Sequence, residues 1–550
     1  MKALNTQLIR ITSLALIFAA NIPMVNAQTY SVLYNLGTNA GDPINPAWIG
    51  TFVQGRDGNL YSTAPAGGDK GFGAIFQLTP SGSMKVLYSF KNMDDGVFPN
   101  SGLTLGTDGS LYGTTPAGGS PGYGTIFKIT TSGVFTTLHG FNGNTEGVSA
   151  SAPPIQGPDG NFYGTTSNGG GAVFGTVYKM TPAGNLTVIH TFDGTLRYPY
   201  ALTLGTDGNF YGTAGGGSGN PYGAIFKVTP QGKVTLLHSF VSTDGQSPLG
   251  TIIQASDGNF YGTTNAGGSG TAGVAYKMTP SGIFTDLFNF ANNGLGMNPR
   301  AGLVQATDGK FYGGTTVNPG ASSGTLFQMT STGTYTDLVL FTNNIGLFPG
   351  GNPQVSLFQH TNGAFYGDTA AGGTGNIGCV TCGVLYKLDM GLGPFVSIVN
   401  WFGKVGQTIE ILGQGLTGTS KVSFNGTSAT FKVVSDTYLT ATLPAGATTG
   451  FVGVTTPGGT RKSNRKFLVL PAVLGFDPPS GPVGTSVTIT GASFTQTQGV
   501  GFGDTIPAQF TVNSDTQITA IVPQGAKTGP IGVKTPGGTA ISKDTFTVTP

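Results

Sequence analysis

Short runs in which hydrophobic positions alternate with small or polar ones follow one another along most of this 550-residue chain. Between residues 102 and 141 there are four such runs, separated by Asp108-Gly109, a glycine-rich loop and Ser132-Gly133. This alternation is typical of β-strands. Asp-Gly and Ser-Gly between strands indicate hairpins, because glycine adopts positive φ and aspartate bonds its own backbone. The segment therefore predicts four antiparallel strands.

The same four-strand unit recurs seven times, which predicts a ring of identical blades. Each copy carries an Asp-Gly or Asn-Gly turn followed by an aromatic pair. These turns begin at Asp57, Asp108, Asp159, Asp207, Asp257, Asp308 and Asn362, so the successive spacings are 51, 51, 48, 50, 51 and 54. A period near fifty residues with four strands per unit is the pattern of a β-propeller. The predicted fold is all-β, a seven-bladed propeller over residues 28–391 followed by two immunoglobulin-like sandwiches.

The strand signatures also predict how the ring closes. The third-strand signature occurs in every copy, for the last time at Tyr386. The fourth-strand signature appears first at Tyr30 to Leu36, before any blade begins, and is absent after Tyr386. We therefore expect Tyr30 to Leu36 to be the outer strand of the blade that contains Tyr366 and Tyr386, an arrangement that leaves no open sheet edge.

The C-terminal part is a tandem pair of about eighty residues each. Val405–Gly413 matches Val483–Gly491 at an offset of 78, and Thr456–Thr460 matches Thr535–Thr539 at an offset of 79. Each copy, 394–470 and 472–550, predicts one small β-sandwich. With Asp477-Pro478-Pro479-Ser480-Gly481-Pro482, the second copy resembles the IPT/TIG domain. The first copy departs from that pattern, since Trp401 stands where Pro479 is expected.

The blade repeat also resembles a known family. The pattern Asp-Gly-Asn-Phe-Tyr-Gly-Thr-Thr at 159–166, followed by Gly-Thr-Val-Tyr-Lys-Met-Thr-Pro at 175–182, is similar to the GloVer-type tandem repeat of exported bacterial proteins, often labelled choice-of-anchor. The resemblance covers about 29–391. It implies an exported repeat protein and no particular activity.

The N-terminal residues 1–27 have the features of a signal peptide. Lys2 and Arg10 precede the apolar run from Ile11 to Val25, and Val25-Asn26-Ala27 fits a cleavage site. No later run is long enough to predict a transmembrane segment. We therefore expect an exported protein, extracellular or at the cell surface, with the periplasm as an alternative.

Charge excludes two classes of partner. Removing Lys2 and Arg10 from the 25 basic residues leaves 23, equal to the 23 acidic residues, so the mature chain has no formal net charge. Nucleic acids and anionic membranes require a basic excess. Residues 461–466 form the one basic cluster, which we interpret as a solvated hairpin, with a polyanion contact as the alternative.

The sequence predicts no catalytic residues, metal or cofactor. The inner strand of each blade carries no Asp, Glu, His or Lys, and the mature chain has only Glu146 and Glu410. Acid–base or metal chemistry requires paired carboxylates or histidine clusters. His139, His190 and His238 occupy one register on separate outer strands, which favours packing over a metal site.

Two further features are interpreted structurally. Cys379 and Cys382, the only cysteines, predict a local disulfide in an exported chain. The third strand repeats a basic position in five blades, which we expect to shield blade edges or pair with turn carboxylates. These residues are Lys128, Lys179, Lys227, Lys277 and Lys387.

A binding role fits these features better than catalysis. The Asp-Gly turns are nearly invariant, whereas the loops on the opposite face vary from blade to blade, and variable loops on a rigid scaffold commonly carry recognition. We expect a non-enzymatic binding or scaffold protein with a carbohydrate or surface-protein partner; the alternative is a polysaccharide hydrolase or lyase with a loop-borne site. The predicted binding residues are Asp94, Arg197, Tyr198, Tyr200 and Arg300.

Overall fold

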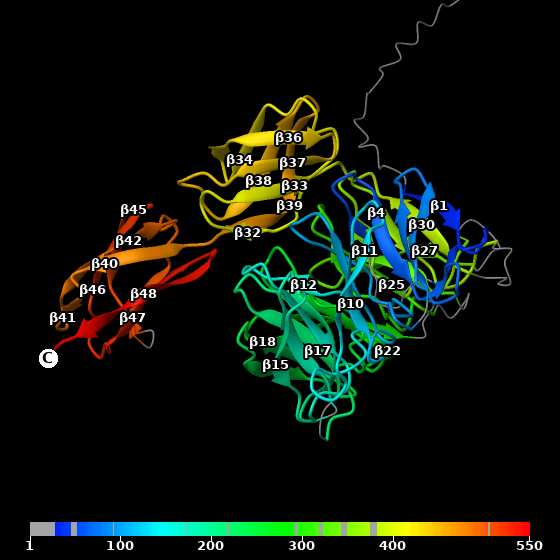
Figure 1. Ribbon diagram of the computed structural model, residues 1–550, viewed down its shortest axis with the longest axis horizontal. Coiled ribbons are helices and arrows are strands. Elements are labelled where there is room, and N and C mark those ends of the chain that lie inside the picture. Colours follow the sequence, from blue (N-terminus) through cyan, green and yellow to red (C-terminus); the bar gives the residue numbers. More distant parts are fainter. Residues whose placement is uncertain are drawn as a thin grey trace, which may run out of the picture.

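The computed structural model describes residues 28–45, 52–91, 93–172, 174–216, 219–291, 295–317, 323–342, 349–374, 382–503 and 506–550. Figure 1 shows a propeller, a first sandwich packed against it, and a second sandwich to one side. All regular elements of the described residues are strands, which confirms the all-β class. None of the described residues forms a helix that could cross a membrane.

Seven sheets of four strands form the blades, as predicted. The first three blades are β3 (Val53–Gln54), β4 (Leu60–Ala64), β6 (Ala74–Leu78) and β7 (Met84–Ser89); β8 (Thr104–Leu105), β9 (Leu111–Thr115), β10 (Thr125–Ile129) and β11 (Phe135–Gly140); and β12 (Ile155–Gln156), β13 (Phe162–Thr166), β14 (Thr176–Met180) and β15 (Leu186–Thr191).

The next three blades follow the same order. They are β16 (Arg197–Leu204), β17 (Phe210–Gly216), β18 (Ala224–Val228) and β19 (Val234–Ser239); β20 (Ile253–Gln254), β21 (Phe260–Thr264), β22 (Thr271–Met278) and β23 (Phe284–Ala291); and β24 (Val304–Gln305), β25 (Phe311–Thr315), β26 (Thr325–Met329) and β27 (Tyr335–Leu340). A short pair, β2 (Pro43–Ile44) and β5 (Ala66–Gly67), lies outside the blades.

The seventh blade joins the two ends of the propeller sequence. It contains β28 (Phe358–Gln359), β29 (Phe365–Asp368), β30 (Val384–Asp389) and the N-terminal strand β1 (Thr29–Asn35). β1 pairs antiparallel with β30, with Tyr30 opposite Leu388 and Val32 opposite Tyr386. The predicted closure is confirmed, and pairing β1 leaves the ring without an open edge.

The Asp-Gly turns are held by their own carboxylates. Asp108 Oδ1 accepts a hydrogen bond from the backbone N–H of Ser110 at 3.0 Å, and its Oδ2 accepts from Tyr112 Oη at 2.9 Å. Lys128 Nζ lies 2.6 Å from the same Oδ2. Equivalent Lys–Asp pairs join Lys179 to Asp159 and Lys277 to Asp257. In these blades the repeated lysines therefore pair with turn carboxylates, one of the roles expected from the sequence.

Glutamines at the ends of the inner strands join neighbouring blades. Gln305 Oε1 accepts the backbone N–H of Ser256 in the preceding blade at 2.8 Å, and Gln305 Nε2 donates to Gly309 O within its own turn. The same arrangement is made by Gln156, Gln254 and Gln359. Gln54 Oε1 likewise accepts the Thr361 N–H of blade seven, but Gln54 Nε2 donates to Thr361 Oγ1. Blade three has Pro158, which lacks an N–H, at the donor position, and the next blade carries Leu204 instead of glutamine.

The two sandwiches have the same strand order. In the first, one sheet contains β31 (Ser397–Ile398), β33 (Thr408–Leu412), β37 (Tyr438–Thr442) and β36 (Phe431–Ser435); the other contains β32 (Phe402–Gly403), β39 (Gly459–Val469), β38 (Gly450–Thr456), β34 (Lys421–Phe424) and β35 (Thr427–Ala429). The second repeats this order with β40 (Ala472–Asp477), β42 (Ser486–Ala492), β46 (Gln517–Ile521) and β45 (Phe510–Ser514), and with β41 (Ser480–Gly481), β48 (Gly538–Val548), β47 (Gly529–Thr535), β43 (Gly499–Phe502) and β44 (Ile506–Pro507).

The first sandwich packs on the Asp-Gly face of the propeller. Leu412 and Tyr438 belong to the same buried cluster as Leu105 of blade two. Trp401 and Phe402 pack against a cluster of blades three and four. A further set of polar contacts joins the two parts: Arg56 Nη2 to Glu410 Oε1 at 2.5 Å, Thr437 Oγ1 to Arg56 O at 2.7 Å, and Gln414 Nε2 to Thr361 Oγ1 at 3.0 Å. The sandwich therefore closes this end of the ring.

Candidate ligand-binding face

The first sandwich covers the Asp-Gly face of the propeller, so the opposite face is the candidate binding site. Each inner strand runs toward its Asp-Gly turn, so the opposite face carries the connection from each outer strand to the next blade and the Gly-Gly loop of each hairpin. We call this surface the loop face. It is the face on which the sequence predicts binding.

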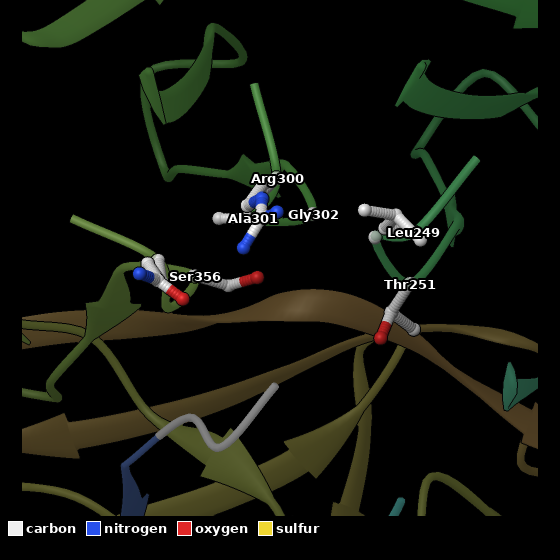
Figure 2. Close-up of a pocket in the computed structure, with 8 residues that line it drawn as sticks. Leu249, Thr251, Arg300, Ala301, Gly302 and Ser356 are labelled. Carbon is white, nitrogen blue, oxygen red and sulfur yellow. The ribbon is translucent and has the colours of Figure 1, made fainter. Parts of the chain in front are cut away.

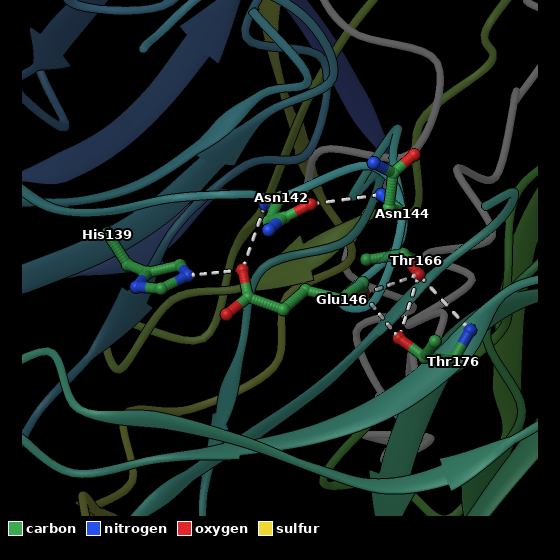
Figure 3. Close-up of polar contacts among 6 residues, drawn as sticks. All are labelled: His139, Asn142, Asn144, Glu146, Thr166 and Thr176. Carbon is green, nitrogen blue, oxygen red and sulfur yellow. Dashed lines mark hydrogen bonds and ion pairs between the residues drawn. The ribbon is translucent and has the colours of Figure 1, made fainter. Parts of the chain in front are cut away.

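Half-buried acids hold the loops of this face in place. Glu146 Oε2 accepts from the backbone N–H of Asn142 at 2.9 Å and lies 2.8 Å from His139 Nε2, as Figure 3 shows. The backbone oxygen of Glu146 accepts from Thr176 Oγ1 at 2.8 Å. The loop therefore begins and ends in fixed positions, and the histidine of the outer strand serves as its anchor.

Other blades use the same device with different residues. Asp95 accepts from Tyr88 Oη at 2.6 Å, and Asp244 lies 3.1 Å from His238 Nε2 while accepting the Val241 N–H at 2.7 Å. Desolvation lowers the pKa of His238, although the nearby Asp244 offsets part of the shift. The register interpreted from sequence as a packing position also anchors loops. The described residues contain no group of three or more His, Cys, Asp or Glu able to hold a metal.

Two aromatic residues of the loop face adopt an unfavourable backbone conformation. Phe98 has φ 59° and Tyr198 has φ 58°. Positive φ is rare for bulky residues and costs roughly 1–3 kcal/mol. The corresponding residues of other blades are Ser149, Ser247, Asn298 and Asn352, also at positive φ. Yet Phe98 is 46% and Tyr198 39% exposed, so core packing does not account for the bulky side chains.

The partners of these residues extend the aromatic set. The Phe98 N–H donates to Phe72 O, and the two rings meet edge to face at 6.5 Å. The Tyr198 N–H donates to Phe174 O. Tyr123 and Tyr222 occupy the position of Phe72 and Phe174 in blades two and four, whereas Ala272 and Ser323 occupy it in blades five and six. We call Phe72, Phe98, Tyr123, Phe174, Tyr198 and Tyr222 the aromatic arc.

Two residues after the positive-φ residue lies a position whose side chain differs in every blade from two to seven. It is occupied by Asn100, Ser151, Tyr200, Leu249, Arg300 and Gln354 in blades two to seven. Arg300, Leu249 and Gln354 line a niche of about 10 Å³, enough for one water molecule. Figure 2 shows Arg300 between Leu249 and Ser356. Gln354 is 6% exposed, and its Oε1 has no hydrogen-bond partner in the structure.

The predicted binding residues lie on this face, distributed over three connections. Asp94 is exposed between blades one and two; Arg197, Tyr198 and Tyr200 open blade four; Arg300 opens blade six. The Arg197 guanidinium lies 5.6 Å from the Phe174 ring centre. Tyr200 is half-buried, and desolvation raises its pKa.

Sequence reasoning missed Phe98, although a signal was present. Phe98-Pro99 and Tyr198-Pro199 are the aromatic versions of the Ser-Pro or Asn-Pro pair that opens blades five, six and seven. It also missed Asp368 on β29, which is 1% exposed and stands where other blades have threonine or glycine. Desolvation raises the pKa of Asp368 well above its usual range.

The cysteine prediction falls partly outside the described residues. Cys382 is buried and disulfide-bonded. Its predicted partner, Cys379, lies outside the described part of the chain.

Family comparison identifies the repeat. The model of the Gloeobacter/Verrucomicrobia repeat matches residues 20–202 and 198–438, more than half of the chain. The protein therefore belongs to this family of repeat proteins. The IPT/TIG domain model matches residues 471–549, the second sandwich. No curated protein is significantly similar to the chain.

The solved structures that match the chain are distant from it. A fungal alcohol oxidase of the AA5 family in complex with copper is 13% identical, covering 93% of this chain and 100% of that one, with a TM-score of 0.43. A luciferin-regenerating enzyme is 12% identical over 67% of this chain and 98% of that one, with a TM-score of 0.36. The surface glycan-binding protein PbSGBP-B of Prevotella bryantii is 19% identical, with a TM-score of 0.22; the match covers 27% of this chain and 38% of that protein.

Proposed function

We propose that this chain is an exported, non-catalytic binding protein that takes up a carbohydrate on the aromatic arc of its loop face. The propeller and first sandwich form the binding unit, and the second sandwich acts as a spacer or adhesion module. The observation that carries the proposal is the pair of exposed aromatic side chains, Phe98 and Tyr198, kept at positive φ.

The conformational cost of these residues favours a functional explanation. Backbone strain persists where the surroundings impose it, and it concentrates at binding sites. Other blades have serine or asparagine at the same positive-φ positions, so the fold does not require a bulky aromatic residue there. An exposed aromatic ring offers a flat apolar surface with adjacent polar groups, which suits the apolar face of a sugar ring.

The anchored loops support binding in a preformed geometry. Asp95, Glu146 and Asp244 each fix a connection on the loop face through backbone and side-chain contacts. A rigid site loses less conformational entropy when its ligand binds. Because these acids already serve as anchors, their arrangement also favours binding over the hydrolase or lyase alternative.

The test uses the full mature chain with Phe98→Gly and Tyr198→Gly combined. A glycan array first identifies a binding oligosaccharide, and calorimetry then measures its affinity. We expect affinity to fall at least tenfold while the melting temperature stays the same or rises, because glycine relieves the positive φ. A matched control, Leu236→Ala with Ile283→Ala, removes exposed apolar side chains from outer edges and should leave affinity unchanged.

The paired readout separates binding from folding. Loss of affinity together with unchanged or raised stability supports the proposal. Unchanged affinity, or equal loss in the control variant, contradicts it.

A further inference from the structure

The first sandwich carries an unbalanced positive charge. Residues 394–470 include seven Lys or Arg and two Asp or Glu, a formal net charge of +5. Both acids are engaged away from most of these cations: Glu410 pairs with Arg56 of the propeller, and Asp436 accepts a turn N–H. The second sandwich has three basic and four acidic residues, and the propeller has thirteen and seventeen. The charge is therefore a property of this one domain.

Much of this charge gathers on the outward face of the five-stranded sheet, where β34, β38 and β39 lie side by side (Figure 1). Along β38, alternate side chains are buried in the sandwich core, so Phe451 and Gly453 face outward. Lys466 stands opposite Phe451, and Lys462 stands opposite Gly453. Lys421 occupies the same face of β34, and the three strands contain no Asp or Glu. We call Lys421, Phe451, Lys462 and Lys466 the lysine face.

A bulge in β39 brings two of these lysines together. Lys462 and Lys466 are four positions apart in the sequence, but their partners on β38 are only two positions apart. Ser463 holds the bulge, because its hydroxyl accepts the Val452 N–H at 3.0 Å and donates to Arg465 O at 2.6 Å. Two residues of strand span about 7 Å, so the two lysines lie on one face at roughly that spacing. Both are exposed, and neither forms an ion pair within the described part of the chain.

The second sandwich shows that the fold does not require these lysines. Its Ser542 makes the same two hydrogen bonds at an equivalent bulge. By strand register, the positions of the three lysines are uncharged in this copy, where they are Gly499, Ile541 and Thr545. Outside the bulge, Lys534 is the one charged residue of the equivalent strands β43, β47 and β48. The lysine face is therefore an addition of the first copy.

We propose that the lysine face binds an acidic polysaccharide, with carboxylates on the three lysines and a sugar ring against Phe451. Neighbouring like charges repel, and a bound carboxylate offsets this repulsion. Lys462 Nζ lies 5.5 Å from the Phe451 ring centre, so a cation and an aromatic surface are presented together. This combination suits a uronic acid, which has an apolar sugar face and a carboxylate.

A linear polymer fits this surface better than a small anion, because the lysines are spread over two strands of a sheet face. DNA carries one charge per about 1.7 Å of its axis, more closely spaced than these lysines. A polyuronate carries one carboxylate per sugar ring. The choice of a polysaccharide rests on the proposed function only for the location outside the cell, and it does not involve the aromatic arc.

The test compares two triple variants of the full mature chain that lose the same charge. The first changes the lysine face: Lys421→Gln, Lys462→Gln and Lys466→Gln. The control changes three exposed lysines elsewhere on the sandwiches: Lys404→Gln, Lys432→Gln and Lys543→Gln. Surface plasmon resonance measures binding to immobilised polygalacturonate at about 20 mM salt, with neutral dextran as the reference surface. We expect the first variant to lose roughly tenfold in affinity and the control less than about twofold, with both melting temperatures unchanged.

Equal losses in the two variants, or equal binding of the wild type to dextran, would contradict the proposal. Equal or tighter binding to a single-stranded oligothymidylate would assign the face to nucleic acid and overturn it. A wild-type dimer that the first variant dissolves would assign the face to the propeller of a second copy, with the same consequence. The Phe98→Gly, Tyr198→Gly variant should bind polygalacturonate as the wild type does, and its loss of binding would place this polymer on the aromatic arc instead. Failure here and failure of the glycan experiment are thus distinguishable.

Discussion

The two sandwiches share one topology but differ in their relation to the propeller. Both pair a four-stranded with a five-stranded sheet in the same strand order. The first is packed against the Asp-Gly face, whereas Figure 1 shows the second apart from the propeller. The second is joined to the first by contacts such as Thr449 N–H to Gln496 Oε1 at 2.8 Å. The same sandwich fold therefore has two roles: the first copy covers one face of the propeller, and the second copy, in its described residues, is attached only to the first.

A few substitutions account for the difference. The docking residues Trp401, Glu410, Leu412, Tyr438 and Leu468 correspond in the second copy to Pro479, Thr488, Thr490, Gln517 and Thr547. The interface thus has large apolar or charged side chains where the second copy has proline, threonine or glutamine. The IPT/TIG model matches the second copy, residues 471–549. Trp401, which stands where the domain pattern has proline, is thus one of the residues that pack the first sandwich against the propeller, while the fold of the sandwich is unchanged.

The largest expected effect comes from truncation. A chain ending at residue 470 should keep the melting temperature of the propeller within a few degrees, because the second sandwich contributes no described contact to it. A chain ending at residue 391 should melt far lower or aggregate, because Leu105 and Leu204 lose their cover. Calorimetry of both chains measures the difference. Equal melting temperatures would show that docking does not stabilise the ring.

The next effect is that of one docking side chain. Trp401→Ala should cost about 3 kcal/mol of unfolding free energy, since the indole packs against two clusters. Pro479→Ala, the equivalent exposed position of the second sandwich, should change stability by about 0.5 kcal/mol or less. Urea unfolding of both variants measures the contrast. Similar costs at the two positions would contradict the docking role of Trp401.

Much of the fold could be predicted from the sequence because it depends on local signals. The repeated Asp-Gly turn and the alternating strands predict seven blades, and the displaced fourth-strand signature predicts that β1 completes the last blade. Six of the seven inner strands have only two residues, as in β8 (Thr104–Leu105), whereas β16 in blade four has eight. The sequence pattern shows where hydrophobic residues occur. It does not show how many residues of an inner strand form β-ladder hydrogen bonds near the axis of the propeller.

Docking and the binding face could be predicted less completely because they depend on long-range contacts. Trp401 stood out only as a departure from a family pattern, and nothing local indicates that it packs against the propeller cluster that contains Leu204. The sequence of one blade likewise does not predict the positive φ of Phe98. The comparison of Phe98-Pro99 with Ser247-Pro248 is needed to identify this position. Pro158 and Leu204 make the same point. Blade three lacks the donor N–H at Pro158, and blade four lacks the glutamine acceptor at Leu204, which only a comparison between blades reveals.

A smaller effect tests what the two sandwiches share. Asp436 Oδ2 accepts the Gly415 N–H at 2.9 Å, and the equivalent Asp515 Oδ1 accepts from Thr495 Oγ1 at 2.7 Å. Asp436→Ala and Asp515→Ala should each cost about 1 kcal/mol, because each removes turn hydrogen bonds. The hydrogen bonds of Thr417 lower the pKa of Asp436, so its stabilising effect is present at neutral pH and is lost as pH falls through that lowered pKa. Urea unfolding at pH 7 and pH 3 checks both statements, and a loss confined to one sandwich would contradict them.

The smallest expected effect concerns the ion pair of the interface. Desolvation raises the pKa of Glu410, and the hydrogen bond and charge of Arg56 offset this only in part. A carboxyl group with a raised folded-state pKa stabilises the fold below its unfolded pKa, and that contribution is lost as pH rises through the folded value. Glu410→Gln should therefore cost less than about 1 kcal/mol at pH 7. Between pH 4 and pH 7 the wild-type protein should lose stability relative to this variant.

Unfolding midpoints of wild type and Glu410→Gln across that pH range measure the difference, with Thr488→Val in the second sandwich as the matched control. The amide side chain of the Glu410→Gln variant would still offer an oxygen to Arg56 Nη2, whose present partner lies at 2.5 Å, so the geometry of the contact can be retained without the charge. A cost of about 3 kcal/mol or more, typical of breaking a net-stabilising buried pair, would show that charge as well as the apolar contacts of Trp401 holds the lid. The expected near-neutral result would assign the pair to orienting the sandwich on the ring, a role that the threonine at the equivalent position of the undocked copy does not have.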